Sequence, residues 1–142
     1  ITEGSINRIW GINSGFDYNL TARENANIYS ILRNIPKNDL DFRLNKIEKF
    51  VDIGKYFDMP MRTFSQGMIS RFLFTLATEW KADINLIDEG IPFADSDFHI
   101  RAKKRLDTFL EQSSILIFAS HSKAYLKNFC REIVVIEEGI IR

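Results

Sequence analysis

The sequence is poor in the residues that build disulfides and metal sites. Among its 142 residues, Cys130 is the only cysteine, and His99 and His121 are the only histidines. One cysteine excludes an internal disulfide and a cysteine-based metal cage, and two histidines argue against a multi-histidine site. No apolar run approaches the roughly 18–20 residues of a transmembrane helix, and the polar start does not read as a signal peptide. We therefore expect a soluble, intracellular chain.

An excess of either charge is also missing. Nineteen Lys and Arg residues balance 19 Asp and Glu residues, so the formal net charge is zero. Nothing in this balance favours binding to nucleic acid or to an anionic membrane surface. What is abundant is apolar: hydrophobic residues make up 45% of the chain and 12 residues are phenylalanine. This content predicts one domain with a well-packed core or an apolar docking surface.

The second half of the chain alternates between strand and helix signals. Short apolar runs predict three strands at 84–87, 115–119 and 133–136. Helical spacing predicts a helix over about 97–112 and a shorter one around 123–130. Continuous apolar strands that alternate with helices indicate a parallel sheet covered by helices on both faces.

The first half instead predicts helices. Thr21 and Glu24 form a capping box before a helix that runs to about Asn34. A second helix is expected over about 38–52, ending at Gly54, and a third from Ser65 to about Trp80. We therefore expect a helical subdomain at about 21–80 attached to an α/β core at about 81–142.

Five residues are candidates for phosphate chemistry. Ser65 suits the N-cap of a helix, and Gly67 in the first turn would let a ligand approach an anion-binding helix start. Asp88 and Glu89 follow a buried strand, where one carboxylate could hold Mg²⁺ and the other polarise water. His121 ends the next strand, and an imidazole there could contact a terminal phosphate. Each also has an ordinary structural alternative: a capped helix, a polar turn or a hydrogen-bonded histidine.

The order of these features resembles the nucleotide-binding domain of ABC transporters. Phe64-Ser65-Gln66-Gly67-Met68 is similar to its signature motif, and Ile84–Glu89 to its Walker B strand. Phe93-Ala94-Asp95-Ser96-Asp97 resembles the D-loop, and Ser120-His121 the switch histidine. The resemblance covers essentially the whole chain. It implies a partial P-loop NTPase (RecA-like) parallel sheet with an inserted ABC-type helical subdomain.

Other residues resemble one branch of that family. Ser14-Gly15-Phe16, Leu20–Asn25 and Thr63–Met68 with Arg71 are similar to ATPases that export capsular polysaccharide, O-antigen or teichoic acid. The resemblance implies a peripheral, cytoplasmic subunit on the inner face of the membrane. This subunit would act as a homodimer with transmembrane permease subunits, without nucleic acid, and would contact the cargo polysaccharide only indirectly.

The resemblance also implies the cofactors ATP and Mg²⁺ and a role for each site residue. Glu89 and His121 would be catalytic, and Asp88 would bind Mg²⁺, with Asn13 as a second metal candidate in place of the family's missing glutamine. The residues expected to meet ATP are Ser65, Gln66, Gly67 and Asp95.

One family motif has no match. The Walker A loop, G-x-x-x-x-G-K-[ST], is not found in the sequence: the only Gly-Lys pair, Gly54-Lys55, is followed by Tyr56. We therefore expect a fragment of an ATPase that by itself neither hydrolyses ATP nor binds it tightly. Two alternatives share the remaining motifs: a non-transport ABC ATPase of translation or DNA repair, and a non-enzymatic ABC-like module that binds partners.

Overall fold

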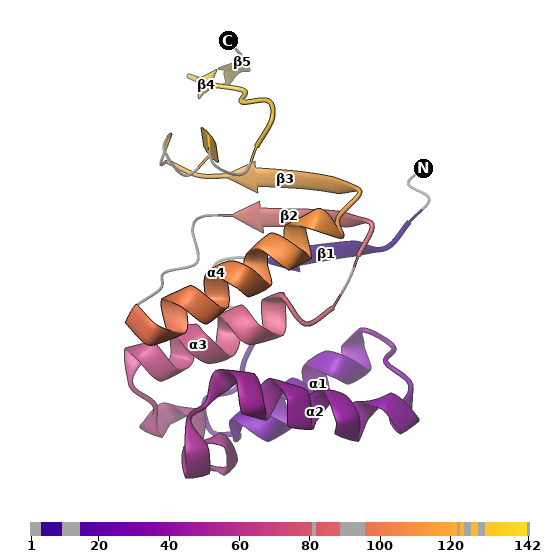
Figure 1. The fold of residues 1–142 in the computed structure, drawn as a ribbon, viewed down its shortest axis with the longest axis vertical. Helices are drawn as coiled ribbons and strands as arrows, with labels where there is room; N and C mark the ends of the chain where they lie inside the picture. The colour runs from indigo at the N-terminus through magenta and orange to yellow at the C-terminus, as the bar shows by residue number, and fades with distance from the viewer. Residues whose placement is uncertain are drawn as a thin grey trace.

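A three-stranded parallel sheet forms one half of the molecule (Figure 1). The computed structural model describes residues 4–9, 15–80, 82–88, 96–121, 123, 126–127 and 130–141. The strands lie in the order β1 (Ile6–Ile9), β2 (Ile84–Asp88) and β3 (Ile115–Ala119), and both pairings are parallel. The prediction of an α/β fold with a parallel sheet is confirmed. The strand β1 was not predicted.

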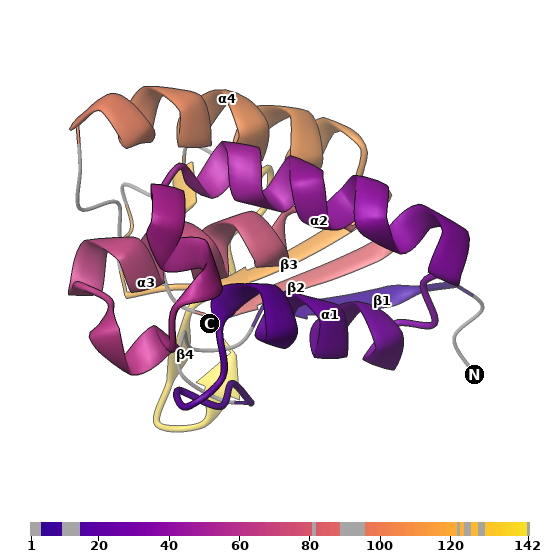
Figure 2. The same cartoon turned by 90° about the horizontal axis from the view of Figure 1, so that it is seen from below.

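The segment between β1 and β2 is helical, and its helices form a layer beside the sheet (Figures 1 and 2). Helix α1 spans Ala22–Leu32, and its N-terminus has the expected capping box, in which Thr21 and Glu24 bond each other's backbone N–H groups. Helix α3 spans Gln66–Ala77 with Ser65 as its N-cap, as predicted. Local sequence therefore determined both of these helix starts.

The end of the second helix differs from the prediction. Helix α2 spans Lys37–Val51 and is capped by Asp52 in the left-handed conformation, with φ of 54°. Gly54, the expected stop, instead begins the short 3₁₀ helix η1 (Gly54–Asp58) with φ of 55°. A second 3₁₀ turn, η2 (Met61–Thr63), leads to the start of α3. Asp tolerates the left-handed region better than most residues, so the helix ends before the glycine is reached.

Two hydrophobic cores meet at α3. One core joins α1, α2, η1 and η2 to α3, and Phe57 and Phe72 are fully buried within it. The other joins Phe74 of α3 and Ile87 of β2 to helix α4 (Ser96–Glu111). The helix predicted over about 97–112 from helical spacing is confirmed as α4, and its buried residues Phe98, Ala102, Leu106 and Phe109 lie on one face. Helix α3 thus contributes to both cores.

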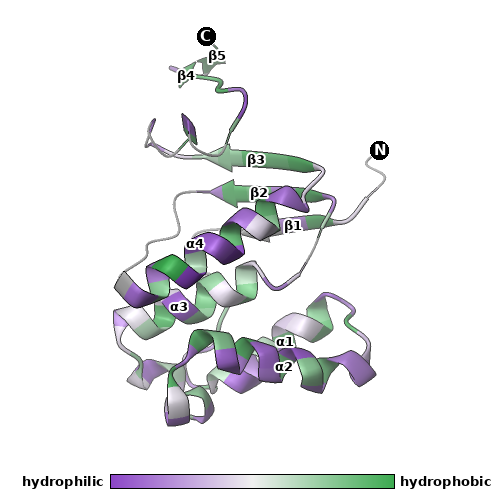
Figure 3. Ribbon diagram, in the orientation of Figure 1, coloured by the Kyte–Doolittle hydropathy of each residue, from purple (hydrophilic) through white to green (hydrophobic). Residues whose placement is uncertain are grey.

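Helices do not cover both faces of the sheet in the described part of the chain. Asn85 and Ile87 of β2 are buried on the α4 side, and Leu116 and Phe118 of β3 are half-buried. On the other face Ile6, Ile115 and Ile117 remain 40–58% exposed. Strand β3 is hydrophobic along its whole length (Figure 3), and the apolar runs of β2 and β3 predicted two covered faces. The helix predicted around 123–130 lies mostly outside the described residues.

The third predicted strand is wrong in its extent and its partner. Of the run 133–136 only Ile136 is in a strand, β4 (Ile136–Glu137), and it pairs antiparallel with β5 (Ile140–Ile141) instead of joining the parallel sheet. Residues 133–135 are 38–60% exposed. A two-residue turn with positive φ at Glu138 and Gly139 closes this hairpin. The short pairing across this turn replaces the longer parallel pairing that the apolar run suggested.

No helix in the described residues is long and apolar enough to cross a bilayer.

Candidate nucleotide-binding site

The start of α3 presents an exposed helix N-terminus. Ser65 has extended backbone angles, and its Oγ accepts a hydrogen bond from the backbone N–H of Met68 at 3.3 Å. The side chains of Ser65 and Gln66 are exposed. The N-terminus of a 12-residue helix carries partial positive charge, so an anion can bind here without further chain movement.

Gly67 keeps this helix start open. Its φ is not positive, and a Cβ placed on it would meet only the Oγ of Ser65, at 3.9 Å. Neither backbone strain nor packing within the described structure requires a glycine at this position. That a ligand approaches the backbone closely at this glycine stays a prediction.

Backbone hydrogen bonds from the segment before α1 hold the turn before Ser65. The N–H groups of Met61 and Arg62 donate to the carbonyls of Leu20 and Tyr18, each at 2.9 Å. Phe64 is buried at 9% exposure beside them. The chain that precedes α1 thus positions the chain that precedes α3.

An ion cluster stiffens the same region. The Nε and Nη2 atoms of Arg23 donate to the two carboxylate oxygens of Asp58 at 2.6 and 3.1 Å, and Nη2 also binds Glu48 at 2.8 Å. The Arg23 guanidinium holds the pKa of the Asp58 carboxyl below its usual range, because hydrogen bonding and charge favour the ionised form. These bonds fix η1 against α1 and α2.

The other predicted site residues follow neighbouring strands. Asp88 ends β2 and is exposed, and its register partner on β3 is Ala119. Ser120 and His121 come directly after Ala119, with His121 exposed. Strands β2 and β3 are neighbours, so Asp88 and His121 lie at adjacent strand ends. The carboxyl ends of neighbouring parallel strands are where ligands bind in open α/β sheets.

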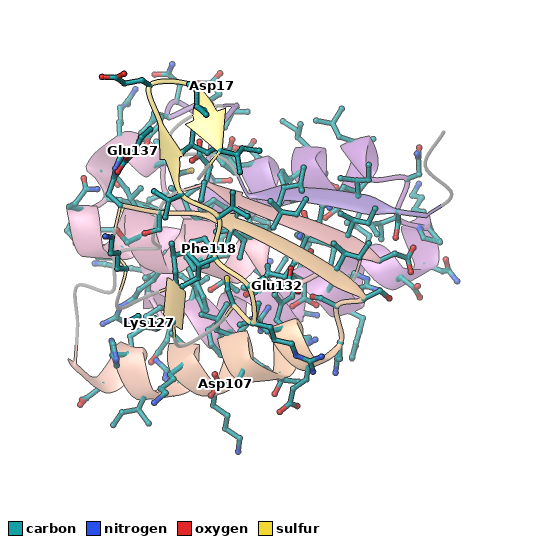
Figure 4. The ribbon with its side chains drawn as sticks, turned by 90° about the horizontal axis from the view of Figure 1, so that it is seen from above. Asp17, Asp107, Phe118, Lys127, Glu132 and Glu137 are labelled. Carbon is teal, nitrogen blue, oxygen red and sulfur yellow. The ribbon has the colours of Figure 1, made fainter. Side chains whose placement is uncertain are left out.

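The side chains behind these strand ends are apolar and face α4. Phe118, one residue before Ala119, packs against the core of α4, whereas Asp107 lies on the exposed side of that helix (Figure 4). The strand ends therefore carry polar groups at the rim and apolar groups beneath them.

The donor set at this rim fits Mg²⁺ only in part. No group of three or more His, Cys, Asp or Glu side chains lies together within the described residues. Asp88 offers one exposed carboxylate, and Mg²⁺ commonly binds one or two carboxylates together with phosphate oxygens and water. Asp88 thus suits a magnesium ion that arrives with a nucleotide. Asn13, Glu89 and Asp95 lie outside the described residues.

Sequence reasoning overlooked one buried charge. Glu79 follows the C-cap of α3, and its carboxylate has no exposed surface. The available signal was a carboxylate inside the apolar stretch Phe72–Trp80, where an unpaired charge would be strongly unfavourable.

No family model matches the chain. Over 99% of its own length, the chain is 33% identical to the O-antigen export system ATP-binding protein RfbE of Yersinia enterocolitica. It is 39% identical to the polysialic acid transport ATP-binding protein KpsT of Escherichia coli over 92%. A teichoic acids export ATP-binding protein, TagH of Shouchella clausii, is 30% identical, also over 92%.

The chain is homologous to ABC ATP-binding subunits. A solved ATP-binding subunit of an ABC transporter superposes on 96% of the chain with a TM-score of 0.76 at 17% identity, which shows the shared ABC fold. The chain spans 59% of RfbE, 58% of KpsT and 36% of TagH. Its homologues among ABC proteins are therefore ATP-binding subunits of polysaccharide export systems, and it corresponds to part of their length.

Proposed function

We propose that this chain is part of an ATPase subunit that drives the export of a lipid-linked polysaccharide. The observation that supports this most is the joint occurrence of export-system relatives over nearly the whole chain and the open helix start at Ser65-Gln66-Gly67. O-antigen, polysialic acid and teichoic acid, which the relatives' names specify, are all long polymers. We therefore assign a long polysaccharide-type polymer as the cargo of the proposed exporter.

In the proposed mechanism two copies enclose ATP between them. The helix start at Ser65, Gln66 and Gly67 of one copy meets the γ-phosphate bound by the other, where the helix dipole stabilises charge that develops during phosphoryl transfer. Asp88 would hold Mg²⁺, which would neutralise phosphate charge. Glu89 would polarise the attacking water, and His121 would stabilise the transferring phosphate. Asp95 couples the two sites, and Asn13 is a further ligand for metal or water.

The proposed partners are a second copy and the permease subunits of the exporter. The subunit would lie on the cytoplasmic face of the membrane, with the permease docked near residues 13–18 and the helical layer. Closure on ATP and opening after hydrolysis would then move the permease, so the polysaccharide itself need not touch this chain. Such coupling of ligand binding to domain closure is a common switching device.

The decisive experiment changes Glu89 in the full-length native protein. Glu89→Gln keeps the side-chain size but removes the carboxylate charge that would polarise the attacking water, so hydrolysis should fall by about 10²-fold or more. ATP-dependent dimerisation should persist, because nucleotide binding does not need this charge. ATPase rate and sedimentation with and without ATP measure the two properties.

A matched control is Glu111→Gln, the same change at the exposed end of α4. It should leave turnover and dimerisation unchanged. Unchanged turnover in Glu89→Gln would remove Glu89 from its role. If the wild-type protein does not dimerise when ATP is added, the alternative of a non-enzymatic, partner-binding ABC-like module would be favoured.

A further inference from the structure

Glu79 places a carboxylate where no solvent reaches it. Its side chain has no exposed surface, although it directly follows the C-cap residue Thr78 at the end of α3. A buried carboxylate is strongly unfavourable unless charges and hydrogen-bond donors surround it. The groups that surround Glu79 therefore show which parts of the molecule are held together there.

Three cations from two helices surround this carboxylate. Arg105 of α4 binds Oε2 through Nη2 at 2.6 Å. Lys46 and Arg43 of α2 lie at 3.1 and 3.6 Å from Oε1. Each oxygen of Glu79 thus faces a different helix, and the carboxylate bridges α2 and α4 from the end of α3.

Arg105 is itself docked on both other helices. Its Nε donates to Thr78 Oγ1 at 2.8 Å and its Nη2 to the carbonyl of Thr75 at 3.2 Å. Its guanidinium lies over the ring of Phe50 of α2, 4.3 Å from the centroid. With only 13% of its side chain exposed, it is held almost rigidly.

A second arginine of α4 makes similar contacts one turn earlier. Arg101 binds the carboxylate of Asp52, the cap of α2, at 3.3 Å and lies 5.8 Å from the Phe50 centroid. The Phe50 ring also packs edge-on against Phe98 of α4, with centroids 5.6 Å apart. Helices α2 and α4 are therefore tied by charge, by stacked cations and by aromatic packing.

We propose that the Glu79 carboxylate joins α2, α3 and α4 into one mechanical unit. The exposed helix start at Ser65 on α3 and the N-terminus of α4 then move together, and any hinge lies outside these three helices. For its role in an ATP-driven cycle this inference rests on the proposed function. The coupling of the three helices does not depend on nucleotide.

Native-state hydrogen exchange on the full-length protein, without nucleotide and in low urea, tests the coupling. In the wild type the slow amides of α2 and α4 should share one opening constant. Glu79→Gln keeps the side-chain volume but removes the charge. It should make the opening constants of α2 and α4 differ by about tenfold, because the charge that pairs with cations of both helices is lost.

Two further variants separate coupling from simple stabilisation. Asp58→Asn breaks an ion pair that joins α1 to η1, so it should leave the ratio of α2 to α4 opening constants unchanged. Arg105→Lys retains a cation for Glu79 but loses the stacked, forked geometry, so it should change the ratio by less than Glu79→Gln. It also allows the comparison if Glu79→Gln does not fold.

Two outcomes would overturn the inference. One is separate opening of α2 and α4 in the wild type, and the other is an equal increase of both opening constants in Glu79→Gln. Because no ATP is used, either result leaves the proposed ATPase function untouched. Loss of hydrolysis in a variant that keeps the coupling would bear on the function alone.

Discussion

The guanidinium of Arg23 lies over the Phe57 ring, 4.8 Å from its centroid, and binds two carboxylates at its edge. Phe57 is fully buried, so the arginine covers a core aromatic residue while its polar edge stays in reach of water. Asp58 and Glu48 come from η1 and α2, which are distant from Arg23 in sequence. A single side chain here orders the turn that leads to Ser65.

The pKa of Asp58 makes this cluster sensitive to acid. Because Arg23 lowers the pKa of the folded carboxyl, the pair stabilises the fold above the unfolded value of about 3.9 and loses this contribution as the pH falls through the lower folded pKa. Asp58→Asn should therefore reduce the free energy of unfolding at pH 7 by about 0.5–1 kcal/mol, a small effect because the pair is partly exposed. Urea unfolding at pH 7 and at pH 2–3 measures it.

The difference between wild type and Asp58→Asn should shrink toward zero at the lower pH and in 1 M salt. A difference that stayed constant with pH would mean that packing, and not charge, accounts for the effect.

At the scale of elements, α3 is the helix on which the two cores depend. Phe72 and Leu76 point into the core of the helical layer, while Phe74 packs against α4, with its ring 5.9 Å from that of Phe98. A helix that is apolar on more than one side belongs in the interior. This explains why its sequence contains so few charges, and why Glu79 at its end is paired so completely.

Phe72 provides a direct measure of this packing. Its ring lies 6.0 Å from Phe16 and 6.3 Å from Phe57 and has no exposed surface. Phe72→Ala should lower the free energy of unfolding by about 3–5 kcal/mol, because a large cavity remains. Phe42 of α2 is 72% exposed, so Phe42→Ala should change it by less than about 0.5 kcal/mol. Equal losses in urea unfolding would contradict the assignment of the core.

For the whole molecule, the asymmetry of the sheet matters most. One face carries α4, whereas the other leaves Ile115 at 50% and Ile117 at 58% exposure. Both outer strands, β1 and β3, pair on one side only in the described structure. Exposed apolar strands at sheet edges favour association between copies.

We expect the 142-residue chain to self-associate through this face. Ile117→Thr keeps a β-branched side chain but reduces its apolar area, so it should lower the associated fraction and change the free energy of unfolding by less than about 0.5 kcal/mol. Ile100→Ala, at a 73% exposed position on α4, is the control and should leave association unchanged. Sedimentation velocity measures both. Unaltered association in Ile117→Thr would place the contact elsewhere.

The sequence by itself determined the features that depend on neighbours a few residues apart. The box between Thr21 and Glu24, the Ser65 cap and the apolar spacing of α4 were all predicted, since each depends on contacts within one or two helical turns. The order of the motifs also indicated the ABC family, which the relatives confirm.

Only the tertiary structure decided what depends on distant partners. β1 contains Asn7, a poor strand former, whose buried amide donates to the carbonyl of Ala77 at 3.1 Å, and no local pattern announces that bond. The strand β4, which begins at Ile136, pairs with β5 in a hairpin and not with the parallel sheet. Glu79 is stable in the interior only because α2 and α4 place cations beside its carboxylate. The candidate site divides in the same way. Local patterns named Asp88 and His121, but the register of β2 and β3 is what places their strand ends side by side, because pairing joins residues that the chain separates.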